Sequence, residues 1–309
     1  MATLKGQNFR ILTYDTTASK FKCIGMSTNC SITLGTNSEE SSTKDDTGNA
    51  KKPEIVSKNW QVTVESLDMQ DIVALLTAMR SFQKFTLLWD EVGTTDNQTP
   101  QGAAFARTGS AYLTDLSITL NNRTNCSKSL QFSGTGQLAK VTTTPAYEVV
   151  TPNRSFTKGQ YLRLFLGSDN TNTPSKVISF PTDLSFHVSM SVESASTKDT
   201  TGDWEVQEPT DLTFDISTNA KVRGADTITS VVGGQALSDL QDIYEASQPV
   251  RFQIANVSGD NNRTKGAVLV GGSVVLSQLQ IDGQNRSDAT YSATLNGWGD
   301  YEIGTPSES

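Results

Sequence analysis

The 309-residue chain contains few side chains that could carry out acid–base or nucleophilic chemistry. His187 is the single histidine, and it lies in a segment where apolar and polar residues alternate. The sequence has no nucleophile elbow, no phosphate-binding glycine loop and no zinc-ligand spacing. General acid–base catalysis would therefore depend on scattered carboxylates. We predict that the protein is not an enzyme and that it needs no cofactor.

The elements that must position these residues occur twice in the chain. Residues 42–48 recur as residues 196–202, at an offset of 154 that also aligns Ile32 with Phe186 and Leu34 with Val188. Residues 68–72 then return as 239–243, and residues 109–114 return as 272–277 at an offset of 163. Three matches in the same order predict a duplicated domain, because the repeats of solenoids and propellers are much shorter.

The residue aligned with each cysteine and histidine in the other copy indicates which side chains that position accepts. Cys23, Cys30 and Cys126 align with Val177, Leu184 and Ala289. We therefore interpret the cysteines as small buried hydrophobic residues. His187 aligns with Thr33, so we interpret it as an ordinary residue on the polar side of a strand. The carboxylates near the predicted helices are assigned to the helix first turn, where the helix dipole favours them; they are Asp68, Asp71, Asp239 and Asp242.

Alternation and turn signals predict a mainly β fold. In the first copy we expect strands near residues 9–14, 30–34, 60–64, 85–89, 112–120 and 129–136, with an irregularity in the fifth. One helix per copy is expected, capped by Asp68 in the first and by a Ser238–Gln241 capping box in the second. The prediction is two tandem β-sandwich or barrel-like domains, each flanked by one helix, at residues 1–141 and 159–309. Residues 142–158 are the expected linker.

The charge of the chain is unevenly distributed. The net charge is −8, but residues 1–154 carry 15 basic and 14 acidic side chains, whereas residues 155–309 carry 10 and 19. A chain this acidic has no general attraction for nucleic acid. No apolar run is long enough to predict a membrane span.

Each copy also contains a long polar excursion between two alternating strands. About ten residues per arm, at about 3.3 Å each, reach roughly 30 Å from the domain body. The tips carry Thr43, Lys44, Asp45 and Asp46 in the first copy, and Thr197, Lys198 and Asp199 in the second. These tips could be solvated turns whose charges serve only solubility. The Thr-Lys-Asp sequence occurs in both of the otherwise diverged copies, which favours a role for the tips in an interaction.

The order of these features resembles the major tail tube proteins of long-tailed bacteriophages. The likeness is carried by residues 22–67 and 176–217, where Thr-Lys-Asp-x-x-Gly stands at the tip of the excursion and a Trp- or Phe-bearing strand and a helix follow. The resemblance implies a virion tail protein, assembled in the host bacterial cytoplasm, whose sheet edges join into a barrel around a channel. It also implies that the long loops contact the adjacent ring.

The same resemblance implies the partners. These are further copies of the chain, other tail proteins such as the tape measure and terminator, and phage DNA that passes through the lumen without specific binding. Most such proteins have one tube domain and form rings of six, so a doubled chain should form stacked rings of three. The alternative is a β-sandwich carbohydrate-binding or adhesive virion module, which exposed aromatic triplets on one sheet would favour.

Overall fold

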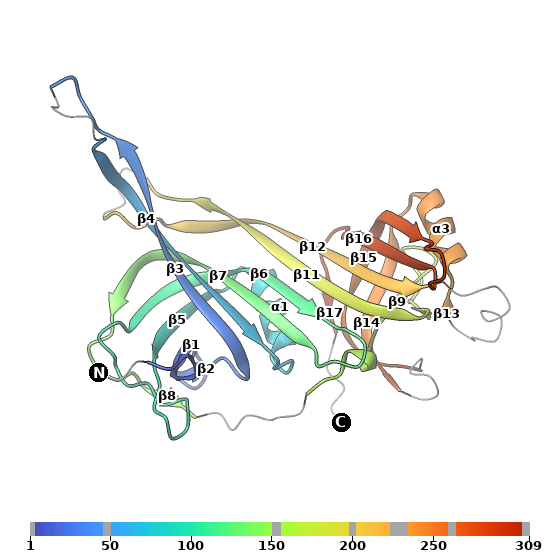
Figure 1. Cartoon of the computed structure of the whole chain (residues 1–309), viewed down its shortest axis with the longest axis horizontal. Helices are drawn as coiled ribbons and strands as arrows, with labels where there is room; N and C mark the ends of the chain where they lie inside the picture. Colours follow the sequence, from blue (N-terminus) through green and yellow to red (C-terminus); the bar gives the residue numbers. More distant parts are fainter. Residues whose placement is uncertain are drawn as a thin grey trace.

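Apolar residues at every second position build a set of long strands that join into one sheet (Figure 1). The computed structural model describes residues 4–45, 51–149, 156–197, 202–222, 234–258 and 264–304. Within them, the main sheet follows the spatial order β3 (Ser27–Glu40), β4 (Pro53–Ser66), β7 (Ser127–Lys140), β6 (Arg107–Thr119), β11 (Pro181–Ser194), β12 (Gln207–Lys221), β16 (Thr290–Gly297) and β15 (Thr264–Asp282). All of these pairings are antiparallel.

Shorter strands extend the sheet in each half. In the first half they are β1 (Phe9–Asp15), β2 (Lys20–Cys23), β5 (Lys84–Glu91) and β8 (Tyr147–Glu148). In the second half they are β9 (Leu162–Leu166), β10 (Lys176–Ile178), β13 (Gly234–Gln235), β14 (Val250–Ser258) and β17 (Glu302–Ile303). β5 pairs with the first part of β6, and β14 pairs with the first part of β15. Phe85 on β5 packs on Phe132, and Phe252 on β14 packs on Phe186, so the sheet folds back over its own apolar face.

Two α-helices are described, α1 (Ile72–Arg80) and α3 (Leu237–Ala246), with short 3-10 turns η1 (Gly6–Asn8) and η2 (Gly159–Tyr161). The capping predictions were wrong in detail. The N-cap of α1 is Asp71, whose carboxylate pairs with the buried Lys128 instead of capping the helix. In α3 the Asp239 carboxylate accepts a hydrogen bond from the Ala236 N–H at 2.8 Å, so the N-cap is Ala236, two residues before the predicted Ser238.

The helix predictions need two further corrections. Asp68 lies before α1 and accepts the Gln70 N–H at 3.1 Å. Asp242 lies in the second turn of α3 rather than in the first. None of the helices in the described ranges is long and apolar enough to cross a membrane.

Large aromatic residues and small partners organise the core of each half. Trp60 lies directly over Gly134, and Phe214 lies directly over Gly297, so a Cβ at either glycine would collide with the ring. Both aromatic residues are at most 5% exposed. The glycines are therefore required because the rings pack against the backbone itself.

The fold class predicted from the sequence is confirmed: the protein is mainly β, with a helix and a long hairpin in each half. The expected irregularity in β6 is a register shift between Leu113 and Asp115. Observed strands are longer than predicted, since β3 and β4 continue as a hairpin to Glu40 and Pro53. Asp46, Lys198 and Asp199 lie outside the described residues.

Candidate functional site: the seam, the outer edges and the arms

The two halves meet where β6 pairs with β11. The register runs from Ser185 opposite Thr119 to Ser189 opposite Asp115. On the apolar side of this seam, Leu116, Ile118, Phe186 and Val188 are all at most 1% exposed. The hydrophobic core therefore passes from one half into the other without a break. Burial of this kind is the main favourable contribution to holding two sheet edges together.

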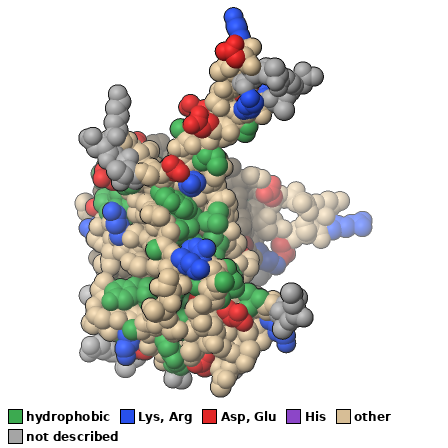
Figure 2. All heavy atoms as spheres, turned by 90° about the vertical axis from the view of Figure 1, so that its left-hand side faces the viewer, with side chains coloured by type: hydrophobic (Ala, Val, Ile, Leu, Met, Phe, Trp, Pro, Cys, Tyr) green, Lys and Arg blue, Asp and Glu red, His purple; other side chains and the backbone are tan. Residues whose placement is uncertain are grey.

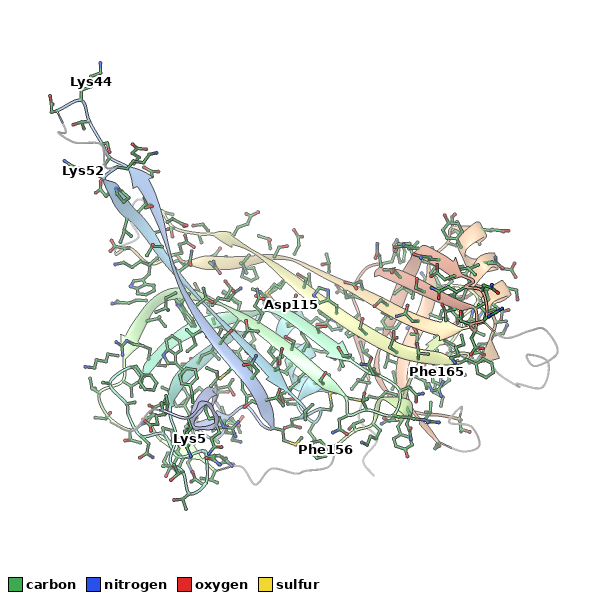
Figure 3. The ribbon with its side chains drawn as sticks, in the orientation of Figure 1. Lys5, Lys44, Lys52, Asp115, Phe156 and Phe165 are labelled. Atoms are coloured by element: carbon green, nitrogen blue, oxygen red, sulfur yellow. The ribbon has the colours of Figure 1, made fainter. Side chains whose placement is uncertain are left out.

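The polar side of the seam carries a three-residue charge cluster. The His187 ring lies between two carboxylates, with Nδ1 at 2.9 Å from Asp215 Oδ1 on β12 and Nε2 at 2.6 Å from Asp115 Oδ2 on β6. Figure 3 places Asp115 where β6 meets β11. Burial lowers the pKa of His187, but its hydrogen bonds to Asp115 and Asp215 outweigh burial and raise the pKa above its ordinary value. As an imidazolium the ring donates to both carboxylates and ties the two halves together.

The sequence placed His187 correctly on the polar side of its strand but missed its partners. Asp115 is 72 residues away along the chain, and only the long-range pairing of β6 with β11 brings it to the ring. The one usable signal was that Thr33, Gln61 and Gln278 stand at the positions matching His187, Asp215 and Asp115. Because the three aligned residues of the other copy are uncharged, the charged contact is expected at the internal seam alone.

The main sheet ends in two edges that have a ladder partner on one side only. In the described chain, β3 pairs with β4 alone, and residues 278–282 of β15 pair with β16 alone. Leu34 on β3 is 64% exposed and Ile281 on β15 is 48% exposed. Both side chains lie at apolar positions of their strands, so the exposed edges carry hydrophobic residues that the chain does not cover. Such edges are sites for pairing with another strand.

The two arms differ in what they contact. The second arm spans residues 194–207, and its described residues 202–207 lie against the first half: Lys58 Nζ is 2.8 Å from Asp203 Oδ2, and the Gly136 N–H donates to Glu205 O at 2.7 Å. The Glu205 carboxylate also accepts hydrogen bonds from Asn37 and Ser57. The second arm is thus an internal clamp across the base of the first arm.

The first arm projects from the body (Figures 1 and 2). Its strands are tied by the Ser41 N–H donating to Lys52 O at 3.0 Å and by Lys51 pairing with Glu40 at 2.8 Å. Thr43, Lys44 and Asp45 are exposed at its end, and Figure 3 shows Lys44 at the tip with Lys52 nearer the body. Thr197 is exposed as well, but on the second arm. Among the tip residues that the structure describes, Thr197 therefore lies on a different arm from Thr43, Lys44 and Asp45.

The face of the main sheet opposite the core is polar. Away from the strand ends, the charged residues of this polar face are Glu65, Asp115, Asp215 and His187, and the strand ends add Asp183, Lys221 and Asp282. Its uncharged members are Ser31, Thr33, Gln61, Thr63, Ser117, Thr119, Ser129, Gln131, Ser185, Ser189, Thr213, Ser217, Gln278, Gln280, Ser292, Thr294 and Asn296. None of these uncharged positions holds a tryptophan, tyrosine or phenylalanine, and the Lys221 side chain at the strand end pairs with Asp288 at 2.7 Å.

The cysteines have no arrangement that suggests redox or metal chemistry. Cys126 is buried, Cys23 and Cys30 are half-buried, and all three are free. Burial raises the pKa of the Cys23 and Cys126 thiols to about 11. Within the described ranges no cluster of His, Cys, Asp and Glu side chains could hold a metal ion.

No family model matches the chain, and no curated protein matches it. Three solved structures share a local likeness. The tail of an empty gene transfer agent particle with C6 symmetry is matched at TM-score 0.38 and 13% identity, over 48% of this chain and 99% of that chain. The virion of a native gene transfer agent particle is matched at TM-score 0.32 and 16% identity, over 48% and 98%. The SPP1 tail tube is matched at TM-score 0.33 and 12% identity, over 48% and 82%. At these scores the likeness does not by itself assign a function.

Proposed function

We propose that the protein is a structural subunit of a virion tail, and that its copies join edge to edge into rings that stack into a hollow tube. The observation that carries the proposal is the main sheet, which crosses from one half to the other and ends in two unpaired apolar edges. Closing a ring satisfies both edges in every copy, whereas a single chain leaves them open. The described polar face has no exposed aromatic triplet, so nothing favours a carbohydrate-binding module.

The chain is proposed to contain two copies of one tube domain, at residues 1–141 and 159–309, joined by residues 142–158. Backbone irregularities support this at the offsets found in the sequence. At offset 154, Met26 and Phe180 both have positive φ, of 42° and 55°. At offset 163, Arg123 and Arg286 have φ of 62° and 64°. The register shift at Leu113/Asp115 in β6 also returns as Leu276/Gln278 in β15. Irregularities of this kind are rarely placed twice by chance.

Three chains per ring follow from two domains per chain, if the ring has the six domains expected from the resemblance. The polar face lines the lumen in this arrangement, because the opposite face is filled by the core and the helices. Its carboxylates, on Glu65, Asp115, Asp183, Asp215 and Asp282, outnumber the basic His187 and Lys221, so the wall is net negative. A wall of this sign repels duplex DNA and leaves it free to slide, whereas lysine–phosphate contacts would slow its passage.

The arms are proposed to have different duties. The first arm, with Thr43, Lys44 and Asp45 at its end, reaches the adjacent ring, and Asp46 belongs to the same tip. The second arm holds the first through Asp203 and Glu205, with Thr197, Lys198 and Asp199 beyond this clamp as a second axial contact. Tape-measure and terminator proteins are the expected partners inside and at the end of the tube.

Electron microscopy of the purified protein tests the proposal directly. We expect hollow tubes or rings in negative stain, with three chains per ring in averaged images. A protein that stays monomeric at high concentration would overturn the tube, and rings of six chains would overturn the stoichiometry alone. A low-salt gel shift should show no retardation of duplex DNA by the unassembled subunit.

A further inference from the structure

We infer that the contact between neighbouring copies is a β-ladder between residues 278–282 of β15 in one copy and residues 31–35 of β3 in the next, in a register set by the internal seam. The inference rests on the proposed ring function and deepens it by naming the interface. Its partner is a second copy of this chain, joined head to tail.

The register follows from two fixed offsets. Subtracting 154 converts β11 into β3, and adding 163 converts β6 into β15. The internal pair of His187 and Ser117 then becomes Thr33 opposite Gln280. By the same conversion Ser31 lies opposite Asp282, and Gly35 lies opposite Gln278. One residue of slip would turn every apolar side chain of the edge to the polar face, so the alternation excludes odd slips. The match to the internal seam then selects this register among the remaining ones.

The exposed fractions of matching side chains show that each outer edge lacks the neighbouring strand found at the internal seam. Val188 is buried in the internal seam, whereas its counterpart Leu34 is 64% exposed. Ile118 is 1% exposed, whereas its counterpart Ile281 is 48% exposed. The same positions of the same strands are thus covered where the second half is present and bare where it is absent. In the proposed ladder the bare Ile281 lies opposite the half-buried Ile32, and the bare Leu34 lies opposite the half-buried Leu279, so each exposed side chain gains an apolar neighbour.

The side chains of the two edges argue against a symmetric pairing and suit the proposed one. The two edges belong to different strands with different side chains, so a symmetric β3–β3 contact would not reproduce the internal seam. Thr33, Gln61 and Gln278 replace the charged triplet of that seam, so the polar side of the new contact is neutral. No carboxylate must be desolvated there without a partner, apart from the rim residue Asp282.

A second contact follows from the docked arm. In the internal contact, the Gln207 N–H donates to Thr135 Oγ1 at 2.9 Å, and Ser133 Oγ donates to Gln207 Oε1 at 2.6 Å. The same conversion places Pro53 of one copy against Trp298 of the neighbour, which is 53% exposed. An exposed tryptophan therefore stands where an apolar arm residue arrives, in place of the polar contact within the chain.

Disulfide trapping tests the register. Thr33→Cys and Gln280→Cys are made in separate chains, mixed, allowed to assemble and oxidised mildly. We expect a cross-linked dimer whose linked peptides contain positions 33 and 280, because opposite residues in antiparallel strands have Cβ atoms about 4.5–5.5 Å apart. The native thiols compete poorly because burial raises their pKa.

Control cysteine pairs distinguish the proposed register from other contacts between copies. Ser31→Cys mixed with Gln278→Cys is four residues out of register and should give less than about a tenth of the cross-link, because about 13 Å separates the positions. Neither Thr33→Cys nor Gln280→Cys should link to itself. Tubes that lack the 33–280 link, or that form a 33–33 link, would overturn the register and leave the tube standing. A chain that never assembles would overturn both.

Discussion

The seam between the halves and the two outer edges of the sheet are built from matching strands but have opposite surroundings. Phe186 and Val188 are fully buried in the seam, while Ile32 and Leu34 lie at the matching positions of an open edge. The difference is not in the local sequence, because both strands alternate in the same way. It teaches that the apolar residues of β3 are not misplaced: the strand has the composition of an internal strand and lacks only a neighbour.

The polar sides of the two contacts differ in charge. The internal seam holds His187 between Asp115 and Asp215, and the matching outer positions are neutral. Charged side chains within one chain are brought to their partners when the chain folds. A free edge with unpaired carboxylates would instead repel the same edge of other copies and would have to desolvate on assembly. A neutral outer edge suits an interface that forms between separate molecules.

The largest effect is expected from placing a charge at the open edge. Leu34→Asp should leave the monomer folded, because the side chain is already 64% exposed, but it should abolish ring formation. A carboxylate buried without a partner costs several kcal/mol, and each 1.4 kcal/mol is a factor of ten, so we expect at least a hundredfold rise in the concentration needed for assembly. Light scattering against concentration measures it.

Val149→Asp is the matched control, since Val149 is 48% exposed and lies outside the main sheet. It should assemble like the parent. Equal loss of assembly in both variants would mean that added charge, not the β3 edge, is responsible.

The next effect separates the two arms. Replacing residues 41–52 by an Asn-Gly turn should keep the β3–β4 hairpin, because Glu40 pairs with Pro53 and that dipeptide suits a two-residue loop. We expect rings that no longer stack into tubes, seen by negative stain, because the projecting arm is the proposed axial contact. Tubes as long as those of the parent would show that stacking does not need this arm.

A smaller effect compares matching core positions. Phe186→Ala should lower the free energy of unfolding by about 3–5 kcal/mol, because it opens a cavity in the seam. Ile32→Ala should cost the monomer much less, since Ile32 is only half-buried, yet it should weaken assembly. Denaturant unfolding and light scattering measure the two quantities. Similar losses of unfolding free energy in both variants would contradict the view that β3 is uncovered in the monomer.

Local signals in the sequence predicted most of the fold. Alternation located the long strands and the hairpins, and the irregular spacing of Leu113 and Leu116 anticipated the register shift in β6. The burial of Lys128 could also be predicted, because Lys128 occupies the same face of its strand as Cys126 and Leu130. It is buried with Asp71 as its partner. The predicted N-caps were wrong by three residues in α1 and by two in α3, because several Ser and Asp residues near each helix start are good N-terminal residues.

The candidate site was less predictable because it depends on contacts between distant segments. The pairing of β6 with β11, the partners of His187 and the docking of Asp203 on Lys58 all join residues far apart in the chain. No periodicity encodes which strand edge meets which. The repeat indicated that matching edges exist, and the exposed fractions of Leu34 and Ile281 then distinguished the open edges from the closed one.

The smallest expected effect is a pH dependence confined to the internal seam. His187→Thr gives the seam the residue found at the outer edge, and it removes the only histidine of the chain. The folded pKa of His187 is raised above 6.5, so its protonated form is bound more tightly in the folded state. Its stabilisation is therefore fully present below 6.5 and is lost as pH rises through the higher folded value. The excess unfolding free energy of the parent over His187→Thr should be constant as pH approaches about 6.5 from below, and should then decline. Since the three side chains are about a third exposed, we expect the excess to stay below about 1 kcal/mol.

Urea unfolding at a series of pH values measures this excess, and Asp115→Asn should reduce its decline with pH because the substitution removes one of the two acceptors. An excess that grows with pH would reverse the sign of the argument and show that neutral His187 is the form preferred at the seam.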